Sequence, residues 1–491
     1  MVSLGYGCLA PLSFRYKPET SATWASVTPS VGYHASVFVN RAAELTALQR
    51  WWAGTDARMA MVWGRRRVGK TALVRRFAEG RWAVFHTGAG RGQGTELTVL
   101  ARQVSSIGAT GVRDLVARGY TDWDDALDHL ALVAEGEPLL LVLDEFSELA
   151  TTTPELPNLL RAFLDRSQGR TRLRILLCGS AVRSMEALQQ QRQPLYGRMD
   201  LTLAVHPFAP WEAALMLPDL RPAERAVVYG IVGGIPMYLA WWDQAAPLTE
   251  NLRALACEPG ARLLTEGELI LATEAETGEY PRAVLHAIAT GSTRHNEIRD
   301  AIRADPTRLL DRLVGLRLIE RVQPVTETGR TRRRCYRISD NFLAFYLDVL
   351  TRYRTEIEAG LGPTVLPVLL GSLDDHQGGR WEAAFRQHVR RLAASGEFGG
   401  QVVAVGPFWT ADGHNEIDVV ALAGRTRTPV LVGEAKWARE VSAPRLVADL
   451  HRKAAALPGA PHDLRVAICA RERVVNRPDD VVAITADDIF A

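Results

Sequence analysis

The sequence predicts an α/β protein of several domains, and three observations support this fold class. The chain has 491 residues, which is too long for one ordinary hydrophobic core and favours two to four domains. Residues 37–205 alternate short apolar runs with amphipathic stretches, as expected of a parallel sheet covered by helices. The same alternation returns in residues 354–491, after a helix-rich middle region.

The composition is that of a soluble globular protein, with 47% hydrophobic and 23% charged residues. No uncharged apolar run reaches the length of about 18 residues that a membrane-spanning helix needs, and the first residues lack the pattern of a secretory signal. We therefore expect a cytoplasmic protein without a membrane partner. Residues 1–36 are expected to form a disordered extension.

Charge and cysteine content exclude some classes of function. The net charge of +2 gives no global positive field for nucleic acid, so any such contact must come from a local patch. The five cysteines are scattered and form no CxxC or Cys/His cluster, which argues against a disulfide framework and a zinc site.

The first domain, residues 37–205, is predicted to be a sheet with helices between its strands. The run 138–143 is continuously apolar, which is typical of a central parallel strand. Residues 206–275 are predicted to form a helical lid, because prolines and the segment GGIP interrupt their helices. Further strands are expected at 58–63, 82–86 and 174–178, and helices at 71–77, 95–107, 123–135 and 155–167.

The next unit, residues 276–345, has the pattern of a winged helix-turn-helix. Three helices are expected at 281–290, 296–303 and 307–316, followed by strands at 318–325 and 335–339 around a basic turn. An aromatic helix at 341–353 would pack this unit onto its neighbour. The last domain, residues 346–491, is expected to contain helices at 381–394 and 442–456 and strands at 401–408, 416–422, 429–437 and 465–469.

A phosphate-binding loop is predicted where GRRRVGKT fits the pattern GxxxxGK[ST] between a strand and a helix. Its glycines let backbone N–H groups face phosphate oxygens, and the helix N-terminus adds partial positive charge. Lys70 would reach the β- and γ-phosphates, and Thr71 would offer its hydroxyl to Mg²⁺. The alternative is a chance match in a loop rich in glycine and arginine. The predicted nucleotide contacts are Gly64, Arg65, Arg66, Arg67, Val68, Gly69, Lys70 and Thr71.

Two acidic residues end the apolar run in LLLVLDEF. Asp144 would hold the Mg²⁺ shell, and Glu145 would orient and activate the attacking water. The alternative is that these residues only cap the following helix.

Together these motifs resemble those of the archaeal-type ATPases in the AAA+/STAND superclass. The resemblance implies a P-loop AAA+-type core that binds ATP and Mg²⁺ and hydrolyses ATP, and it allows a homo-oligomer. It extends in the expected order over residues 38–240 through the segments FVNRAAELTAL, LLCGSAVRSMEAL, PLYGRMDL and VGGIPMYL.

The resemblance also implies roles for single residues. Arg41 and Glu44 would lie near the nucleotide, and Ser180 would be the first sensor beside the γ-phosphate. Arg198 would act as an arginine finger on its own site or a neighbour's, and Pro236 would touch the adenine or hinge the lid. The simpler alternatives are a turn cap for Ser180, a surface ion pair for Arg198 and a plain turn before Pro236.

Arginines gather on the expected winged helix. The third helix would enter the major groove of DNA and the wing would touch phosphates. The alternative is a rigid spacer or protein contact, because Asp305 and Asp311 dilute the helix charge. The expected DNA contacts are Arg308, Arg312, Arg332 and Arg333, with Arg303, Arg330 and Arg334 nearby.

The last domain carries a second set of candidate catalytic residues. Side chains alternate between the two faces of a strand, so Glu434 and Lys436 would share one face. A hairpin would bring Asp418 onto the same face. The carboxylates, with Glu382 from the preceding helix, would hold Mg²⁺ while the lysine stabilises negative charge. The arrangement resembles the PD-(D/E)xK nuclease fold, and the region resembles the uncharacterised C-terminal domain that accompanies these ATPases. The alternatives are ordinary ion pairs on a surface strand pair, or a nuclease fold that binds nucleic acid without cutting it.

Two functional hypotheses follow. In the first, ATP hydrolysis repositions the winged helix and presents a restriction-endonuclease-like domain to DNA. In the second, the chain is a STAND-like signalling switch whose C-terminal domain only binds a partner or nucleic acid. A transport or metabolic kinase is disfavoured, because the lid and winged helix would have no part in it.

Overall fold

A computed structural model of the protein describes residues 38–111, 113–273, 279–329, 331, 333–399, 401–461 and 464–491. The expected N-terminal extension, Arg330 and Arg332 lie outside these described residues. Phe38–Ala491 forms a single contact-dense unit. Within the described part of the chain, no helix combines the length and apolarity needed to cross a membrane.

The first sheet has five parallel strands in the order β2-β3-β4-β1-β5. Every residue of β1, β3 and β4 is buried, which explains why these strands read as continuous apolar runs. The four predicted strands are confirmed and β5 was missed. The strands are β1 (Met59–Trp63), β2 (Ala83–Thr87), β3 (Leu139–Asp144), β4 (Leu173–Gly179) and β5 (Leu201–Ala204).

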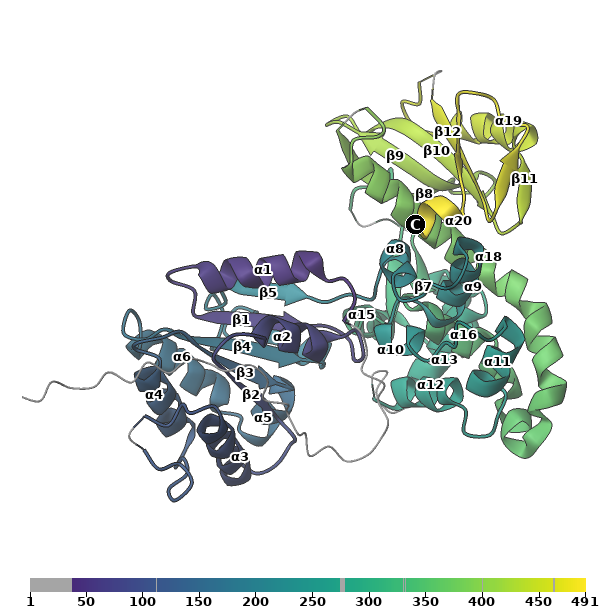
Figure 1. Ribbon diagram of the computed structural model, residues 1–491. Coiled ribbons are helices and arrows are strands. Elements are labelled where there is room, and N and C mark those ends of the chain that lie inside the picture. Colours follow the sequence, from purple (N-terminus) through teal and green to yellow (C-terminus); the bar gives the residue numbers. More distant parts are fainter. Residues whose placement is uncertain are drawn as a thin grey trace, which may run out of the picture. The chain divides into compact units, whose positions relative to one another are not determined.

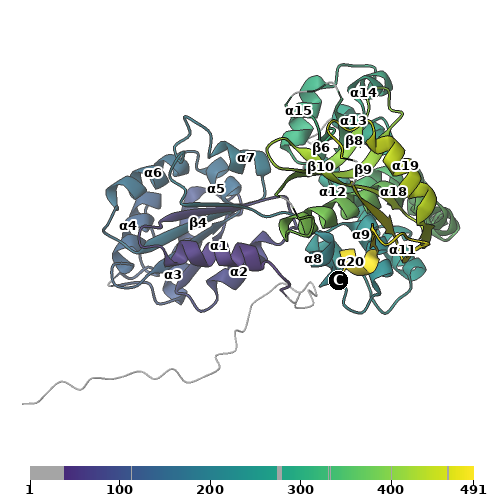
Figure 2. The ribbon, with the colours of Figure 1, turned by 90° about the horizontal axis from the view of Figure 1, so that it is seen from above.

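Helices cover both faces of this sheet, and each face has its own hydrophobic core (Figures 1 and 2). One core contains α1 (Ala42–Ala53) and α2 (Lys70–Ala78). The helices on the opposite face are α3 (Gln93–Ser106), α4 (Trp123–Val133), α5 (Phe146–Thr152), α6 (Leu156–Arg166) and α7 (Val182–Ala187).

Short helices follow in residues 206–273, and we call this part of the chain the lid after its expected role. Three of them start with a proline in the first turn, where its missing N–H costs nothing. A Cβ at Gly234 would lie 1.9 Å from Phe208 O, so only glycine fits the turn before Pro236. The helices are α8 (Pro210–Ala214), α9 (Pro222–Val232), α10 (Pro236–Leu239), α11 (Leu248–Ala256) and α12 (Arg262–Thr273).

Three helices and an antiparallel hairpin come next. The hairpin is shorter than predicted, because only four residues of each strand pair. The helix predicted at 341–353 ends earlier as α16 (Asn341–Asp348), and short helical turns continue to Leu361. The other elements are α13 (Glu279–Ala289), α14 (His295–Ile302), α15 (Thr307–Gly315), β6 (Ile319–Val322) and β7 (Cys335–Ile338).

A separate, mixed sheet forms the C-terminal part, in the order β14-β12-β10-β9-β8. Strands β8 to β10 are antiparallel, whereas β10, β12 and β14 are parallel. Of the elements in this part, the sequence did not predict β11, β13, β14 and the last helix. The elements are β8 (Val402–Trp409), β9 (Glu416–Ala423), β10 (Thr428–Lys436), β11 (Glu440–Ser442), α19 (Ala443–Ala454), β12 (Arg465–Ala470), β13 (Arg473–Val475), β14 (Val481–Ile484) and α20 (Ala486–Ile489).

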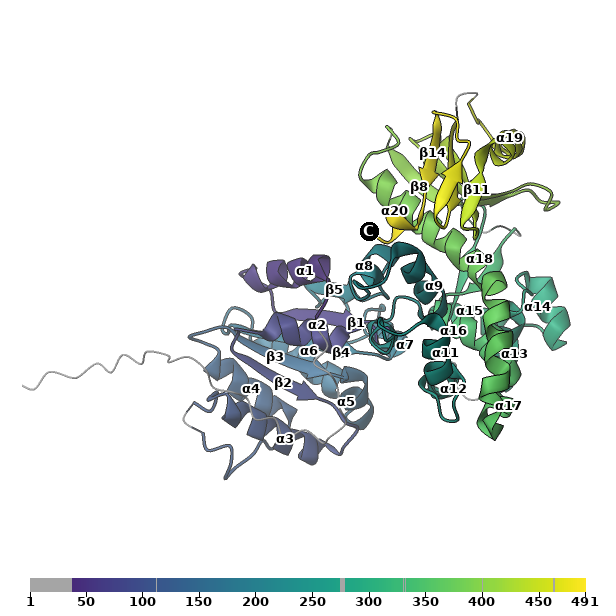
Figure 3. The ribbon, with the colours of Figure 1, turned by 45° about the vertical axis from the view of Figure 1, so that its right-hand side comes forward.

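One long helix, α18 (Gly362–Ala394), packs on both the lid and the C-terminal sheet (Figure 3). It begins well before the predicted residue 381. Gln377 Nε2 donates to Val227 O at 3.0 Å, and a Cβ at Gly230 would lie 1.7 Å from Gln377 Oε1. A single hydrophobic core runs from Phe208 to Phe490, so the three segments expected after residue 205 share their interior.

Candidate functional site

The loop between β1 and α2 has the backbone that phosphate binding requires. Gly64 has φ 155°, and a Cβ there would lie 2.3 Å from Val205 O. Gly69, with φ 92°, is the N-cap residue of α2. Both positions therefore need glycine. The loop ends at the N-terminus of α2, where free backbone N–H groups can bind phosphate oxygens.

The loop's polar side chains meet the strand-end acid. Thr71 Oγ1 donates to Asp144 Oδ2 at 3.1 Å, so the hydroxyl and carboxylate predicted to share Mg²⁺ lie side by side. Oxygen ligands of this kind fit Mg²⁺. Lys70 is buried and its Nζ donates to Arg65 O at 2.8 Å. Burial and the neighbouring Asp144 raise the pKa of the Cys178 thiol well above its usual range, so it stays neutral behind this acid.

Glu145 and Ser180, predicted as base and sensor, are joined by a hydrogen bond. Ser180 Oγ donates to Glu145 Oε2 at 2.8 Å. Glu145 follows β3 and Ser180 follows β4, at the carboxyl edge of the sheet where open α/β folds bind ligands. Glu145 adopts a left-handed backbone conformation with φ 49°, and its side chain reaches Ser180 at the end of the neighbouring strand β4.

Arg41 supports the loop from behind. Its Nη2 donates to Val68 O and to His206 O, both at 2.8 Å. Its Nη1 pairs with Glu44 at 2.9 Å, and its guanidinium lies 4.3 Å from the centre of the Phe208 ring. Arg41 therefore links the phosphate loop to the start of the lid.

Pro236 lies beside the phosphate loop, whereas Arg198 lies at the surface. A Cβ at Gly69 would be 3.8 Å from Pro236 Cγ. Arg198 pairs with Asp165 at 2.8 Å, in the surface arrangement that was its simpler alternative.

The arginines of the loop make contacts that no sequence pattern signalled. Arg65 Nη1 lies 3.0 Å from Asp340 Oδ2, and Arg67 forms an ion pair with Glu266. Arg66 is exposed. Glu266 looks like an ordinary helix residue in the sequence and Asp340 like a helix cap, so only their folded positions connect them to the loop.

The second candidate cluster assembles on β9, β10 and α19. Gly433 pairs with Val419, so the adjacent positions Glu434 and Asp418 face one another on antiparallel strands. Asp418 Oδ2 accepts a hydrogen bond from Ala435 N at 2.8 Å. Lys436 Nζ lies 2.7 Å from Glu434 Oε1, and Lys453 Nζ lies 3.2 Å from Glu434 Oε2. Lys453 was missed because a lysine in an amphipathic helix carries no distinguishing pattern.

Burial and acidic neighbours set the electrostatics of this cluster. Burial raises the pKa of Asp418 to about 7, and repulsion from Glu382 and Glu434 adds to the rise. Glu382 is linked to Asp418 through Arg386, whose Nη1 lies 3.6 Å from Glu382 and donates to Asp418 O at 3.1 Å. Among the described residues, no three His, Cys, Asp or Glu side chains are grouped closely enough to hold a metal ion.

Of the expected DNA-contact arginines that the structure describes, two are exposed and one is half-buried. Arg308 and Arg312 on α15 are exposed. Arg333 pairs with Glu327 and donates to Trp409 O at 3.4 Å, so the hairpin turn rests on β8. Val325 N also donates to Pro407 O at 2.8 Å.

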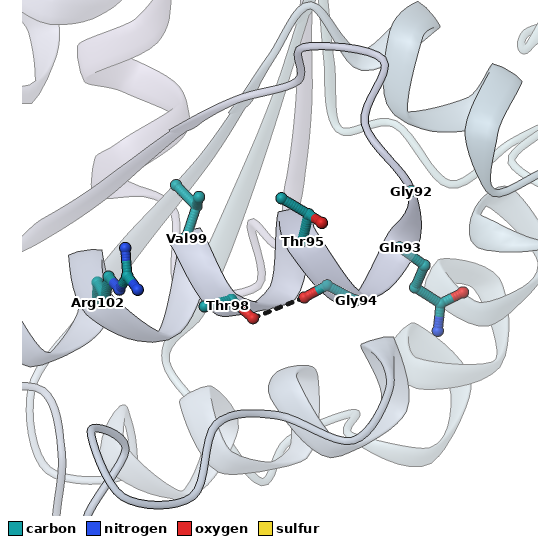
Figure 4. Close-up of a pocket in the computed structure, with 7 residues that line it drawn as sticks. All are labelled: Gly92, Gln93, Gly94, Thr95, Thr98, Val99 and Arg102. Carbon is teal, nitrogen blue, oxygen red and sulfur yellow. Dashed lines mark hydrogen bonds between the residues drawn. The ribbon is translucent and has the colours of Figure 1, made fainter.

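A shallow depression also follows one side of α3, away from both clusters (Figure 4). Thr98 Oγ1 donates to Gly94 O at 2.7 Å in its wall. No residue of the phosphate loop or of the Asp418 cluster lines it. Its lining residues are Gly92, Gln93, Gly94, Thr95, Thr98, Val99 and Arg102.

Two regions of the chain match known families. Residues 38–241 match a family of ATPase domains predominantly from Archaea. This region is an archaeal-type P-loop ATPase domain. Residues 346–447 match a family of archaeal and bacterial proteins of unknown function. The ATPase match covers the loop, Asp144, Glu145, Ser180 and Pro236.

The chain is also similar to individual proteins from two archaea. An uncharacterized protein of Methanocaldococcus jannaschii is 25% identical over 428 residues, covering 85% of this chain and 92% of that protein. An uncharacterized ATP-binding protein of the same organism is 45% identical over 49 residues, which are 10% of this chain and 83% of that protein. The Walker-type ATPase of Pyrococcus abyssi aligns with a TM-score of 0.50 at 20% identity, covering 64% of this chain and 96% of that structure. The parallel sheet therefore has the P-loop ATPase fold.

Proposed function

We propose that the protein binds ATP with Mg²⁺ at residues 64–71 and hydrolyses it. The contact between Thr71 and Asp144 carries this proposal, because it places two hard oxygen ligands at the end of a phosphate-binding loop. The match of residues 38–241 to an ATPase family supports the same activity. The ATP-binding protein of M. jannaschii adds support from sequence similarity.

Each residue of the site has a definite task in this reaction. The loop's N–H groups and Lys70 bind the phosphates, and Thr71 and Asp144 hold Mg²⁺. When bound, Mg²⁺ neutralises phosphate charge. Glu145 orients water and accepts its proton, and Ser180 fixes the Glu145 carboxylate through the hydrogen bond between them. Arg198 would approach a phosphate only after leaving Asp165, on its own site or that of a neighbouring subunit.

The C-terminal part is proposed to cleave DNA in a metal-dependent reaction. The observation that supports it is a buried Asp418 facing Glu434, with Lys436 and Lys453 on the same carboxylate. Asp418 and Glu434 would supply carboxylate oxygens to Mg²⁺, and Glu382, which is not grouped with them among the described residues, would have to move closer to join them. Lys436 would stabilise negative charge on the phosphate. The unit of α13 to α15 with its β6–β7 hairpin is proposed to be a winged helix that brings Arg308 and Arg312 to DNA.

A second candidate is an ATP-driven switch whose C-terminal part only binds a partner or nucleic acid. Two observations favour it. The acidic side chains are not grouped as a metal cluster among the described residues, and both oxygens of Glu434 are already paired with lysines.

The experiment that separates these candidates is DNA cleavage by the full chain with Mg²⁺ or Mn²⁺, with and without ATP. Lys436→Ala should abolish cleavage and leave ATP hydrolysis intact, whereas Lys70→Ala shows whether ATP controls cleavage. Arg439→Ala, an exposed cation paired with Glu472, is the matched control. ATP hydrolysis without any cleavage by the native chain would favour the switch.

Loss of the Ser180 hydroxyl is expected to slow ATP hydrolysis with little effect on ATP binding. Ser180→Ala removes the hydrogen bond that orients Glu145. We expect a fall in kcat of about tenfold, which corresponds to about 1.4 kcal/mol, and an unchanged KM. Steady-state kinetics measure both, with exposed Ser184→Ala as the control. A raised KM with unchanged kcat would place Ser180 in substrate binding instead.

A further inference from the structure

Two arginines of the phosphate loop are held by carboxylates that lie beyond the ATPase domain. Arg65 Nη1 lies 3.0 Å from Asp340 Oδ2, and the two side chains are 7% and 2% exposed. Arg67 pairs with Glu266, which is also buried. The position of the loop therefore depends on α12 and on the residue that precedes α16.

Asp340 divides its carboxylate between the phosphate loop and α16. Its Oδ2 contacts Arg65, while its Oδ1 accepts a hydrogen bond from Leu343 N at 3.0 Å and caps the helix. Residues 342–347 of α16 are buried, and all of them except Ala344 belong to the core that runs to the C-terminus. A shift of Asp340 would thus displace a helix that the lid and the C-terminal part share.

Glu266 connects the loop to the lid in the same way. Its Oε1 accepts a hydrogen bond from the Tyr238 hydroxyl at 2.7 Å and also pairs with Arg67. Tyr238 belongs to the short helix that starts at Pro236, beside Gly69. The loop, the lid turn and α12 therefore form one connected set of polar contacts.

A nucleoside triphosphate brings several negative charges to a loop that already holds two buried carboxylates. The planar guanidinium group forms bidentate hydrogen bonds with phosphate as well as with carboxylate. Phosphates bound at the loop would therefore compete with Asp340 and Glu266 for Arg65 and Arg67. If the ion pairs weaken ATP binding by some factor, thermodynamic linkage requires that bound ATP weakens the ion pairs by the same factor.

We propose that the pairs Arg65–Asp340 and Arg67–Glu266 form an ionic latch that ATP opens. The latch transmits the phosphate state of the loop to α12 and α16, and through their shared core to the C-terminal sheet. This inference rests on the proposed binding of ATP at the loop. It assigns the regulation of that site to two residues outside the ATPase domain.

The test uses Asp340→Asn, Glu266→Gln and the double variant in the full chain. Asn keeps an oxygen to cap α16, and Gln keeps an acceptor for Tyr238, so each change removes the charge of the ion pair and keeps the neighbouring hydrogen bond. ATP affinity is measured by calorimetric titration, and the opening of α12 and α16 by amide hydrogen exchange with and without ATP. We expect each single variant to bind ATP about 3- to 10-fold more tightly. In the native chain ATP should speed exchange in α12 and α16, whereas the double variant should exchange fast already and not respond.

The outcomes distinguish the latch from the binding site itself. Unchanged or weaker ATP binding by both single variants would overturn the latch. So would a native chain that is saturated with ATP and shows no change in amide hydrogen exchange in α12 and α16. If Lys70→Ala binds ATP as well as the native chain, the proposed nucleotide site fails instead. Glu258→Gln removes an exposed ion pair with Arg253 and should behave as native. If Asp340→Asn does not fold, Glu266→Gln alone decides, because its partner Arg67 is partly exposed.

Discussion

Replacing Glu145 with glutamine is expected to lower ATP hydrolysis by about 10²- to 10⁴-fold while leaving ATP binding intact. Glutamine has nearly the same shape and can still accept the hydrogen bond from Ser180, but it cannot take a proton from water. Asp144, Thr71 and Lys70 remain in place to bind nucleotide and Mg²⁺. The measurement is single-turnover hydrolysis together with ATP affinity by titration.

The control for this prediction is Glu148→Gln, one turn further along α5. It removes the same charge near the site without touching Ser180, and hydrolysis should stay within about twofold of native. Full hydrolysis by the Glu145→Gln variant would exclude Glu145 as the proton acceptor. Loss of ATP affinity would show instead that this carboxylate acts in binding.

Asp418→Asn is expected to stabilise the fold above pH 7 and to have little effect near pH 4. The pKa of Asp418 is about 7, above the usual 3.8 of an aspartate, so the folded protein holds a proton that the unfolded chain releases. Native stability therefore falls as pH rises from about 4 to 7 and stays low above it. Three pKa units correspond to roughly 4 kcal/mol, and asparagine avoids this loss because it does not ionise.

Denaturant unfolding at several pH values tests this prediction. The difference in the free energy of unfolding between Asp418→Asn and native should grow from pH 4 to pH 8. Asp480→Asn, at an exposed position before β14, should follow the native profile. Parallel profiles for Asp418→Asn and native would mean that the Asp418 carboxylate is not held in a costly environment.

The parts of the fold that sequence predicted are those with strong local patterns. The central strands read correctly because every residue of β3 and β4 is buried. The loop was predictable because its chemistry needs glycine at fixed positions. The facing of Asp418 and Glu434 followed from side-chain alternation along two adjacent strands.

The parts that sequence missed depend on distant contacts. The first half of α18 contains Pro367 and the pair Gly378–Gly379, which lower helix propensity, yet packing against α9 and α11 makes it helical. β5 has four residues and a weak burial pattern, so its partner β1 defines it. Lys453, Asp340 and Glu266 join their sites only through the tertiary fold.

The lid, α18 and the C-terminal sheet share one core, and this limits which substitutions and domain exchanges the protein can accept during evolution. Gly230 has room for no side chain because Gln377 fills the space beside it, although the two residues lie in separate family regions. A recombination event that replaced one region alone would bring together surfaces that had not been selected for each other. The ATPase region and its companion are therefore expected to be inherited as a pair, with compensating substitutions across this contact.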